Sequence, residues 1–322
     1  MTDLDHPASE PTGDPAGDLG PVGFIGLGAI GAPIARHLLD HPGGLVVCDV
    51  SAEAVAPFVE AGAVAVASPR EVGERCRVVS VMVRDDEQVR AVVAGPDGIA
   101  AGAAEGTVIA IHSTIRAETA EELAAELAPR GIAILDAPVS GSVVGAHEGS
   151  LAVMVGGDED ALERCRPPFE CWSGLIVHMG AVGAGTRAKL ARNLLQFVTF
   201  AAAGAAQRLA EASGISLRRL GRIVRHSDGI TGGPSSVFLR PTTAPMAPDD
   251  PLFGALAHAA VLGEKDLALA LELGGELGVD LPMAAYAYEH LAGALGLPDD
   301  DPLDDLAGDL ADDLADDEES DR

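Results

Sequence analysis

Lysine is nearly absent from this sequence. Of its 21 basic residues only two are lysines, Lys189 and Lys265, and all the others are arginines. Arginine keeps its charge at any ordinary pH, whereas a lysine that is buried or close to other cations can lose its proton and act as a base. Lys189 stands in the segment GTRAKLARN, residues 185–193. Its isolation among arginines suggests proton transfer, and chance placement is the competing interpretation.

Positive charge as a whole is scarce. The net charge is −29 at pH 7, with thirteen acidic residues in 299–322 and five in 1–20. The remainder carries 32 acidic and 20 basic residues, about −12. It holds no basic patch with interleaved aromatic residues. Because such a surface repels phosphate backbones, the composition argues against a nucleic-acid partner.

Long hydrophobic runs and cysteine pairs are also missing. The longest apolar stretch, FVTFAAAGAA at residues 197–206, is too short to cross a bilayer. Secretory and mitochondrial signals carry Lys or Arg, but neither residue precedes the first apolar run of this sequence. The four cysteines, at 48, 76, 165 and 171, form no CxxC pair and have no His at metal-binding spacing. We therefore expect a reduced, cytoplasmic protein without a membrane partner or a bound metal.

From residue 21 onward, short apolar runs alternate with helical patterns, beginning with VGFIG and a helix to about residue 40. Further strand-like runs are LVVCDV, RVVSVMV, TVIAIHST and GIAILDAP. Strands separated by helices are typical of βαβ units and a parallel sheet. After LIVHMG at 175–180 the sequence favours helices almost to its end, beginning with a long helix over about 185–212. The pattern predicts a Rossmann-type doubly wound α/β domain over residues 21–182 and an all-helical domain over 183–297.

The two ends differ in kind from the rest. Residues 1–20 and 298–322 are acidic, and the second segment is of low complexity. Its leucines at 303, 306, 310 and 314 could line one face of a weak helix, but adjacent carboxylates oppose that helix. We expect both ends to be disordered tails.

A glycine-rich turn follows the first predicted strand. In GFIGLGAIGAP, residues 23–33, Gly26, Gly28 and Gly31 have the spacing GxGxxG and enclose Leu27, Ala29 and Ile30. The first glycine permits a tight turn, the second leaves room for a pyrophosphate, and the third lets helix and strand pack closely. The amides at the helix start then face the phosphates. Isolated, the pattern is weak, but here it lies between a strand and a helix.

The second predicted strand ends at Asp49, 18 residues beyond Gly31. A carboxylate at this position accepts hydrogen bonds from the adenosine ribose hydroxyls and repels a 2′-phosphate. Asp49 therefore favours NAD, with NADP the less favoured cofactor. A helix cap or turn is the alternative role, although Ser51 is an equally good cap.

A second loop, Ser140-Gly141-Ser142, directly follows a strand. Backbone amides and hydroxyls at such a turn suit a carboxylate or another small anion. A flexible loop without a ligand remains the alternative.

With these motifs the sequence resembles the β-hydroxyacid dehydrogenases, which include 3-hydroxyisobutyrate dehydrogenase. Four segments match in order: GFIGLGAIGAPIARHL for the dinucleotide, DAPVSGSVVGAHEGSLAVMVGG for the substrate, GAVGAGTRAKLARN for catalysis, and GEKDLALALELG near the C-terminus. The matches occur within residues 21 to about 290. The resemblance implies hydride transfer between a small 3-hydroxy acid and NAD(P), and a homodimer or homotetramer.

The resemblance also assigns roles to individual residues. Lys189 is the general acid/base, and Asn193, one helical turn on, is a substrate ligand. Ser140, Gly141 and Ser142 bind the substrate carboxylate. Thr114 lies by the cofactor, and Lys265 reaches the nicotinamide side of the cleft.

Two positions are compared with the family pattern. The family commonly has two glycines after the serine of the substrate loop, whereas here the second is Ser142, which adds a side chain where substrate should lie. Members that prefer NADP often carry Asn-Arg after the second strand, where this chain has Asp49-Val50.

His112, which precedes Ser113-Thr114, is interpreted as a core histidine.

In the expected mechanism a neutral Lys189 accepts the proton of a 3-hydroxyl, and Arg187 and Arg192 together with burial lower its pKa. Two alternatives remain. Imine reductases share the scaffold but usually have Asp or Tyr at the catalytic position. A non-catalytic dinucleotide-binding module would be expected to lose the lysine.

Overall fold

The computed structural model describes residues 20–298. The two acidic tails, for which disorder is predicted, therefore fall outside the described residues except at their inner ends. The chain forms two compact units, and the division between them falls after Asn193. Unit 1 contains all the strands of the described chain, and unit 2 is helical.

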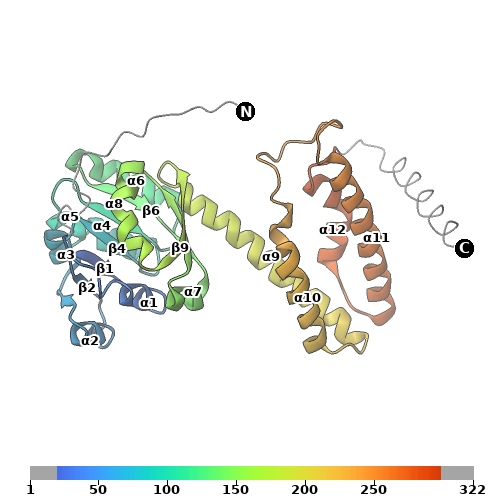
Figure 1. Ribbon diagram of the computed structural model, residues 1–322, viewed down its shortest axis with the longest axis horizontal. Coiled ribbons are helices and arrows are strands. Elements are labelled where there is room, and N and C mark those ends of the chain that lie inside the picture. Colours follow the sequence, from blue (N-terminus) through green and yellow to red (C-terminus); the bar gives the residue numbers. More distant parts are fainter. Residues whose placement is uncertain (1–19, 299–322) are drawn as a thin grey trace, which may run out of the picture. The chain divides into compact units, whose positions relative to one another are not determined.

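Unit 1 is built around a nine-stranded sheet, shown in Figure 1. Its strands are β1 (Val22–Ile25), β2 (Leu45–Cys48), β3 (Val64–Ala65), β4 (Val78–Val81), β5 (Val108–Ile111), β6 (Ala133–Asp136), β7 (Val139–Ser140), β8 (Leu151–Gly156) and β9 (Ser173–Gly180). The strand order is β3-β2-β1-β4-β5-β6-β8-β7, with β9 paired to β8. The first six strands are parallel, and β8 runs antiparallel to β6 and β7. This order confirms the predicted Rossmann-type sheet.

The parallel strands end in register. Ile25 of β1 pairs with Cys48 of β2 and with Val81 of β4. Val81 in turn pairs with Ile111, and Ile111 pairs with Asp136. Because these five residues form one row, the segments that follow them leave the sheet at the same edge. Ligands of open α/β sheets bind at this edge.

Helices cover both faces of the sheet. They are α1 (Gly31–Arg36), α2 (Ala52–Glu60), α3 (Pro69–Arg75), α4 (Asp86–Ala94), α5 (Ile99–Gly102), α6 (Ala117–Leu127), η1 (Ala128–Arg130), α7 (Ser142–Glu148) and α8 (Glu159–Glu170). Neighbouring residues of a strand point to opposite faces. Phe24 accordingly joins a core with Ile34 of α1 and Phe169 of α8. Ile25 joins a second core on the other face, with Leu123 of α6.

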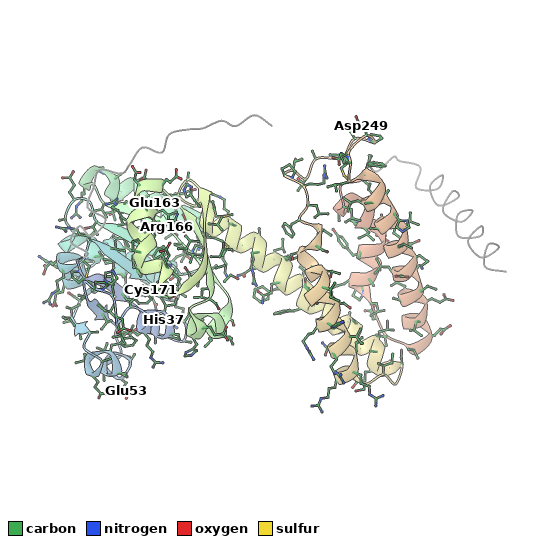
Figure 2. The ribbon with its side chains drawn as sticks, viewed as in Figure 1. His37, Glu53, Glu163, Arg166, Cys171 and Asp249 are labelled. Atoms are coloured by element: carbon green, nitrogen blue, oxygen red, sulfur yellow. The ribbon has the colours of Figure 1, made fainter. Side chains whose placement is uncertain are left out.

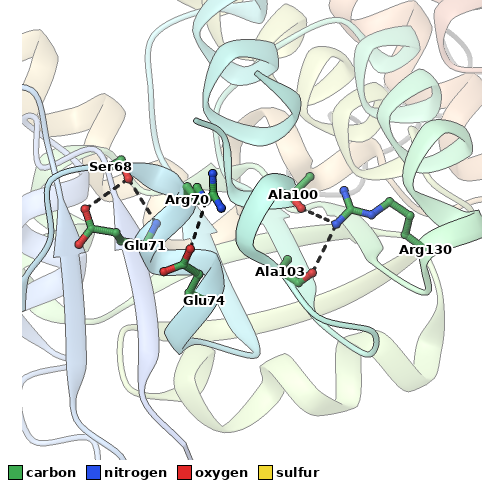
Figure 3. Close-up of polar contacts among 7 residues, drawn as sticks. All are labelled: Ser68, Arg70, Glu71, Glu74, Ala100, Ala103 and Arg130. Atoms are coloured by element: carbon green, nitrogen blue, oxygen red, sulfur yellow. Dashed lines mark hydrogen bonds and ion pairs between the residues drawn. The ribbon is translucent and has the colours of Figure 1, made fainter. Parts of the chain in front are cut away.

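Side-chain caps and bridges fix the helices beside the first strands, as Figure 3 shows. The hydroxyl of Ser68 accepts a hydrogen bond from the Glu71 amide at 3.4 Å, which caps the start of α3. The guanidinium of Arg130 donates to the carbonyls of Ala100 and Ala103, at 2.6 and 3.4 Å, and so satisfies the end of α5. These contacts hold α3 and α5 in place without burying an unpaired backbone group.

The helix predicted to run to about residue 40 is shorter in the structure, because α1 ends at Arg36. The following residues form tighter turns, in which the amides of His37, Leu38 and Leu39 bond to carbonyls three residues earlier. The imidazole of His37, labelled in Figure 2, then donates through Nε2 to the carbonyl of Ala146 on α7 at 3.0 Å.

Unit 2 contains helices and their connections. The long helix α9 (Ala184–Ala212) begins in unit 1, and α10 (Leu217–Thr231), η2 (Gly233–Val237), α11 (Phe253–Leu277) and α12 (Pro282–Ala294) follow it. After Gly180 no strand occurs in the described chain. The predicted change from strands to helices at this point is thereby confirmed.

His112 is buried, with 1% of its surface exposed, which confirms the prediction of a core histidine. Its Nδ1 donates to the Ala137 carbonyl at 2.8 Å, and its Nε2 accepts from the Ser80 hydroxyl at 3.0 Å. The rings of Phe169 and Trp172 lie edge-on to it, with centroids 5.2 and 5.3 Å away. Burial lowers the pKa of His112 to about 4, because a charged imidazole would be desolvated there.

We predict that His112 makes unit 1 less stable in mild acid. Because its pKa falls from 6.5 in the unfolded chain to about 4 in the fold, the unfolded state binds more protons between these values. As the pH falls from 7.5 to 5, the free energy of unfolding of the native protein should decrease by about 2 kcal/mol through this group. The His112→Gln variant should not show this decrease. Trp172, the one tryptophan of the chain, reports unfolding by its fluorescence. Equal losses in the two proteins would contradict the prediction.

Candidate functional site

The glycine loop has the geometry that its spacing predicts. Gly26 has φ +96°, and a Cβ there would overlap the Met82 carbonyl oxygen. A Cβ at Gly31 would overlap the Gly26 carbonyl oxygen, so β1 and α1 can approach only without side chains. At Gly28, in contrast, nothing lies within 4 Å of an added Cβ. The second glycine therefore faces open space, as a phosphate-binding loop requires.

A cavity of about 620 Å³ opens beside this loop. Its lining includes five loop residues and the residues that directly follow β2 and β4, namely Gly26, Gly28, Ala29, Ile30, Gly31, Asp49 and Met82. Leu27, also predicted as part of the site, is buried and contributes its backbone amide. The size and the open glycine fit a dinucleotide laid across the carboxyl ends of β1, β2 and β4.

Both carboxylate oxygens of Asp49 are held by the backbone. Oδ2 accepts from the Leu27 amide at 2.6 Å, and Oδ1 accepts from the Ser51 amide at 2.8 Å. The cap of α2 is Ser51, whose hydroxyl accepts from the Ala54 amide at 3.2 Å. Asp49 is thus no helix cap, but its bond with the Ser51 amide is the turn contact that was the alternative role. Its carboxylate is also fixed against the glycine loop, and each oxygen keeps a free lone pair.

Arg84 is a cavity residue that the sequence analysis missed. It follows β4 and, with Asp49, supplies the charged side chains of the cavity lining. Its side chain is 81% exposed and lies 3.8 Å from the Asp85 carboxylate. Its place in the fold indicates this role. β1 lies between β2 and β4, so the sheet order reverses there, and loops at such a switch point contact the ligand.

The predicted cofactor residue Thr114 is exposed after β5 and is not part of the cavity lining. Its neighbour Ser113 is buried and ties two loops together. The Ser113 hydroxyl donates to the Val83 carbonyl at 2.6 Å and accepts from the Val83 amide at 3.0 Å. Because Val83 lines the cavity, Ser113 shapes the cavity wall from outside.

The predicted substrate loop joins β7 to α7. Ser140 is half-buried at the end of β7, and Gly141 and Ser142 are exposed. Gly141 has φ +136°, and Ser142 has φ +60°, the one positive φ of a non-glycine residue in the described chain. An L-residue in this region is strained, so Ser142 occupies a backbone position that favours glycine. The serine that stands here in place of the family's second glycine therefore has a strained backbone conformation.

Lys189 is 9% exposed, on the second turn of α9. Burial lowers the pKa of its ammonium group, and the nearby positive charge of Arg192 lowers it further. No hydrogen bond or acidic side chain among the described residues opposes this shift. A lysine in this state loses its proton more readily than an ordinary lysine, which is the property expected of a base.

The two flanking arginines differ in role, which corrects the expectation that both act on Lys189. Arg187 turns away to α6, where it pairs with Glu121 at 2.7 Å and with Glu118 at 3.9 Å. Arg192 remains the cation that depresses the pKa of Lys189. Asn193 is half-buried on the same helix and accepts from the Arg192 guanidinium at 3.4 Å.

The start of α9 is held by Asp136, the last residue of β6. Its Oδ1 accepts from the Gly183 amide at 2.7 Å, and its Oδ2 accepts from the Thr186 amide at 2.6 Å. The sequence analysis quoted this residue within the substrate segment but gave it no role. Its contacts join residues 47 and 50 positions apart, so no local pattern indicates them.

Lys265 lies in unit 2, on α11, with 61% of its side chain exposed. It forms an ion pair with Asp266 at 3.4 Å. Its assignment to the cofactor remains a prediction.

In the described part of the chain, no group of three or more His, Cys, Asp or Glu residues is placed to hold a metal ion. Within residues 20–298 no helix combines the length and apolarity that a bilayer crossing needs.

Family models match both parts of the chain. The NAD binding domain of 6-phosphogluconate dehydrogenase matches residues 21–180, and the NAD-binding domain of NADP-dependent 3-hydroxyisobutyrate dehydrogenase matches residues 183–302. The chain belongs to the 3-hydroxyisobutyrate dehydrogenase family. Members of this family are NAD(P)-binding hydroxyacid dehydrogenases.

Several members of the 3-hydroxyisobutyrate dehydrogenase family are similar over most of the chain. An uncharacterized oxidoreductase of Mycobacterium tuberculosis is 55% identical over 87% of this chain and 95% of its own. An NAD-dependent L-serine dehydrogenase of Pseudomonas aeruginosa is 37% identical over 83% of this chain and 89% of its own. A solved M. tuberculosis 3-hydroxyisobutyrate dehydrogenase with L-serine is 31% identical, with a TM-score of 0.60 over 86% of this chain and 96% of its own.

Imine reductases share the fold at lower identity. A solved imine reductase from a Pseudomonas species has a TM-score of 0.65 over 86% of this chain and 96% of its own, with 18% identity. At this identity the likeness concerns the fold alone.

The different surroundings of the two arginines give a matched test of Lys189 as a base. Oxidation needs the neutral amine, so its rate should rise with pH and level off above the pKa of Lys189. Arg192→Gln removes a nearby positive charge, raises that pKa, and should shift the rising limb to higher pH. Arg187→Gln should leave the limb in place, because Arg187 is paired with Glu121. Measuring kcat/KM against pH for the three proteins checks this, and equal limbs would contradict it.

Proposed function

We propose that this protein oxidises a small 3-hydroxy acid with NAD as the hydride acceptor. The observation that carries the proposal is Lys189, a buried lysine of lowered pKa at the start of α9, in a chain that has one other lysine, Lys265, and 19 arginines. A dinucleotide-binding module without catalysis has no use for such a residue, because burying an ammonium group is unfavourable. The proton-transfer role accounts for both its identity and its surroundings.

The chain's own residues would divide the work as follows. Neutral Lys189 accepts the proton of the substrate hydroxyl, and Asn193, one turn on along α9, orients that oxygen. Ser140, Gly141 and Ser142 bind the substrate carboxylate through hydroxyls and backbone amides. The bound nicotinamide supplies the redox chemistry by taking the hydride from the hydroxyl-bearing carbon.

The substrate proposal draws on the relatives and on Ser142. One relative is named an L-serine dehydrogenase, and a solved relative is titled as holding L-serine. Both names concern short 3-hydroxy acids. The exposed Ser142 side chain takes space in the loop that we assign to the carboxylate, which favours a small acid over a long one.

The cofactor proposal favours NAD over NADP because of Asp49. Its carboxylate is fixed at the cavity beside the glycine loop, where it suits a ribose diol and repels a 2′-phosphate. Arg84 is the opposing charge in the lining, but it lies beside the Asp85 carboxylate. That acidic neighbour weakens its attraction for a second phosphate.

Imine reduction is the second candidate, because an imine reductase shares this fold, although at 18% identity the likeness carries no argument about activity. Lys189 argues against it, because family resemblance implies Asp or Tyr at the catalytic position of imine reductases. A cationic or neutral amine suits a hydroxyl substrate, whose proton it can take and return.

Self-association as a homodimer or homotetramer is part of the proposal. Unit 2 exposes large apolar side chains on α9, α10 and the segment after η2, among them Phe197 (60%), Ile223 (66%), Ile230 (73%) and Phe238 (74%). Soluble monomers rarely expose so many large apolar residues, and contact with a second copy would bury them. The sedimentation behaviour of the full chain measures this association.

Lys189→Arg tests the catalytic role. The change keeps charge, length and helix propensity, so a loss of rate cannot be ascribed to an unfolded helix. Because arginine cannot give up its proton, kcat should fall by about a hundredfold to ten-thousandfold. NAD affinity should change little, since the cavity lining contains no residue of α9. Steady-state kinetics and NAD titration provide the two measurements.

Lys265→Arg is the matched control, because it replaces the other lysine of the chain in the same way. It should retain more activity, since no proton passes through it in the proposed mechanism. If Lys189→Arg keeps most of its kcat, the proton travels by another route and the proposed function fails.

Asp49→Asn tests the cofactor preference. Loss of the negative charge removes the repulsion of a 2′-phosphate, while the amide can still accept from one backbone N–H. We expect the native protein to favour NAD, and the variant to favour it less. The ratio of kcat/KM values for NAD and NADP measures the change. A native preference for NADP would show that Asp49 does not select the cofactor.

A further inference from the structure

The helix that carries Lys189 has no cap of its own. The residues before and at its start, Ala181, Val182, Gly183 and Ala184, have no side-chain oxygen, so none of their side chains can cap α9, and the Ala184 amide bonds to the Ala181 carbonyl at 3.0 Å. In the other helices of unit 1 that have a side-chain cap, the cap residue immediately precedes the helix, as Asp158 does for α8. The start of α9 instead takes its cap from the sheet, through Asp136.

The contact between Asp136 and α9 is tightly enclosed. Asp136 has no exposed surface. A Cβ at Gly156 would overlap Asp136 Oδ1, and a Cβ at Gly185 would overlap the carbonyl oxygens of Asp136 and Met154. Glycines at both positions let the first turn of α9 lie directly on the ends of β6 and β8. The helix start therefore has little room to move against the sheet.

Burial and hydrogen bonding have opposite effects on the pKa of the Asp136 carboxyl. Burial raises the pKa of its carboxyl, and the Thr186 and Gly183 amides act in the opposite direction by binding the charged form. The positive end of the α9 dipole adds to them. Asp136 is absent from the groups that affect the pKa of Lys189. Any effect on Lys189 must therefore pass through the placement of the helix.

Asp136 also begins the substrate segment. It lies four residues before Ser140, and the Pro138 carbonyl between them accepts from the Met154 amide of β8 at 3.1 Å. Lys189 lies three residues after Thr186, which is close to one helical turn. One carboxylate therefore connects the strand that leads into the proposed carboxylate loop with the turn that leads to the proposed base.

We infer that Asp136 is a positioning residue, which caps α9 from the end of β6 and thereby fixes Lys189 relative to the loop of Ser140, Gly141 and Ser142. The inference rests on the proposed function. Its mechanism is geometric: without the two bonds the first turn of α9 loses its attachment to the sheet. Displacement of a catalytic group by about 1 Å can cost about a hundredfold in rate.

The test compares Asp136→Asn and Asp136→Ser in the full chain. The asparagine keeps one acceptor oxygen but presents an NH2 group to the other amide, and the serine is too short to reach both. We expect kcat to fall by about tenfold in Asp136→Asn and further in Asp136→Ser, with NAD affinity within about twofold of the native value. Asp158→Ala, which removes the cap of α8, is the control for the loss of a helix cap and should leave kcat unchanged.

A second measurement does not depend on activity. Because the chain has only two lysines, labelling lysine with carbon-13 at Cε yields two NMR signals, and Lys265 serves as the internal reference. In the native protein the Lys189 signal should titrate below the range of an ordinary lysine. In the Asp136 variants its midpoint should move up toward that range, because a loosened first turn exposes the amine to water. The Lys265 signal should stay where it is.

The two measurements separate the inference from the proposed function. If the native protein turns over no 3-hydroxy acid, the proposed function fails, while the lysine titration still tests whether Asp136 positions Lys189. If the variants only lower the melting temperature and keep both kcat and the Lys189 midpoint, Asp136 is a structural residue and the inference is overturned. It is equally overturned if neither variant folds, as circular dichroism and Trp172 fluorescence would show.

Discussion

The carboxyl ends of β1, β2, β4, β5 and β6 lie in one row across the sheet, and the chemistry proposed for unit 1 depends on this alignment. The row brings the glycine loop, Asp49 and Arg84 to the same cavity, although they lie up to 58 residues apart in the chain. A parallel sheet imposes this arrangement, because each strand must return through a helix before it can run in the same direction again. The last member of the row, Asp136, extends the same edge to α9.

Two buried ionisable groups, Asp136 and Lys189, lie at or near this edge of the sheet, and different neighbours set their pKa values. Asp136 is surrounded by backbone amides and the start of a helix, which bind a carboxylate. Lys189 is buried without an acidic partner among the described residues and with a second cation nearby. Burial raises the pKa of Asp136, and the hydrogen bonds from the Thr186 and Gly183 amides oppose that rise, whereas burial and Arg192 both lower the pKa of Lys189. The difference separates a group that holds the structure from a group suited to proton transfer.

Local strain is concentrated in the proposed substrate loop. Gly141 and Ser142 both have positive φ, and α7 begins at Ser142. His37, which follows α1, contacts α7, and β7 pairs with β8, so both sides of the loop are held. Rigid surroundings of this kind can maintain a serine in a conformation that it adopts at a cost.

Most of the fold was predictable from the sequence, because its signals are local. The alternation of apolar runs and helical patterns predicts the parallel sheet and the later change to helices, and the sheet order and α9 confirm both. The spacing of Gly26, Gly28 and Gly31 predicts a tight turn with one open glycine, which the structure has. The end of α1 was misjudged, since the turns after Arg36 and the contact of His37 with α7 depend on a distant segment.

By itself the sequence determined that Lys189 lies between two arginines, that an acidic residue directly follows the second strand, and that Ser142 stands where the family commonly has a glycine. Only the tertiary structure decided which neighbours these residues have. Arg187 pairs with Glu121, 66 positions away, and so leaves Arg192 as the cation acting on Lys189. Asp136 finds its amides 47 and 50 positions away. Spacing along a helix or strand is written in the chain, whereas burial and charge pairing arise when distant segments pack, and they set the pKa of a lysine.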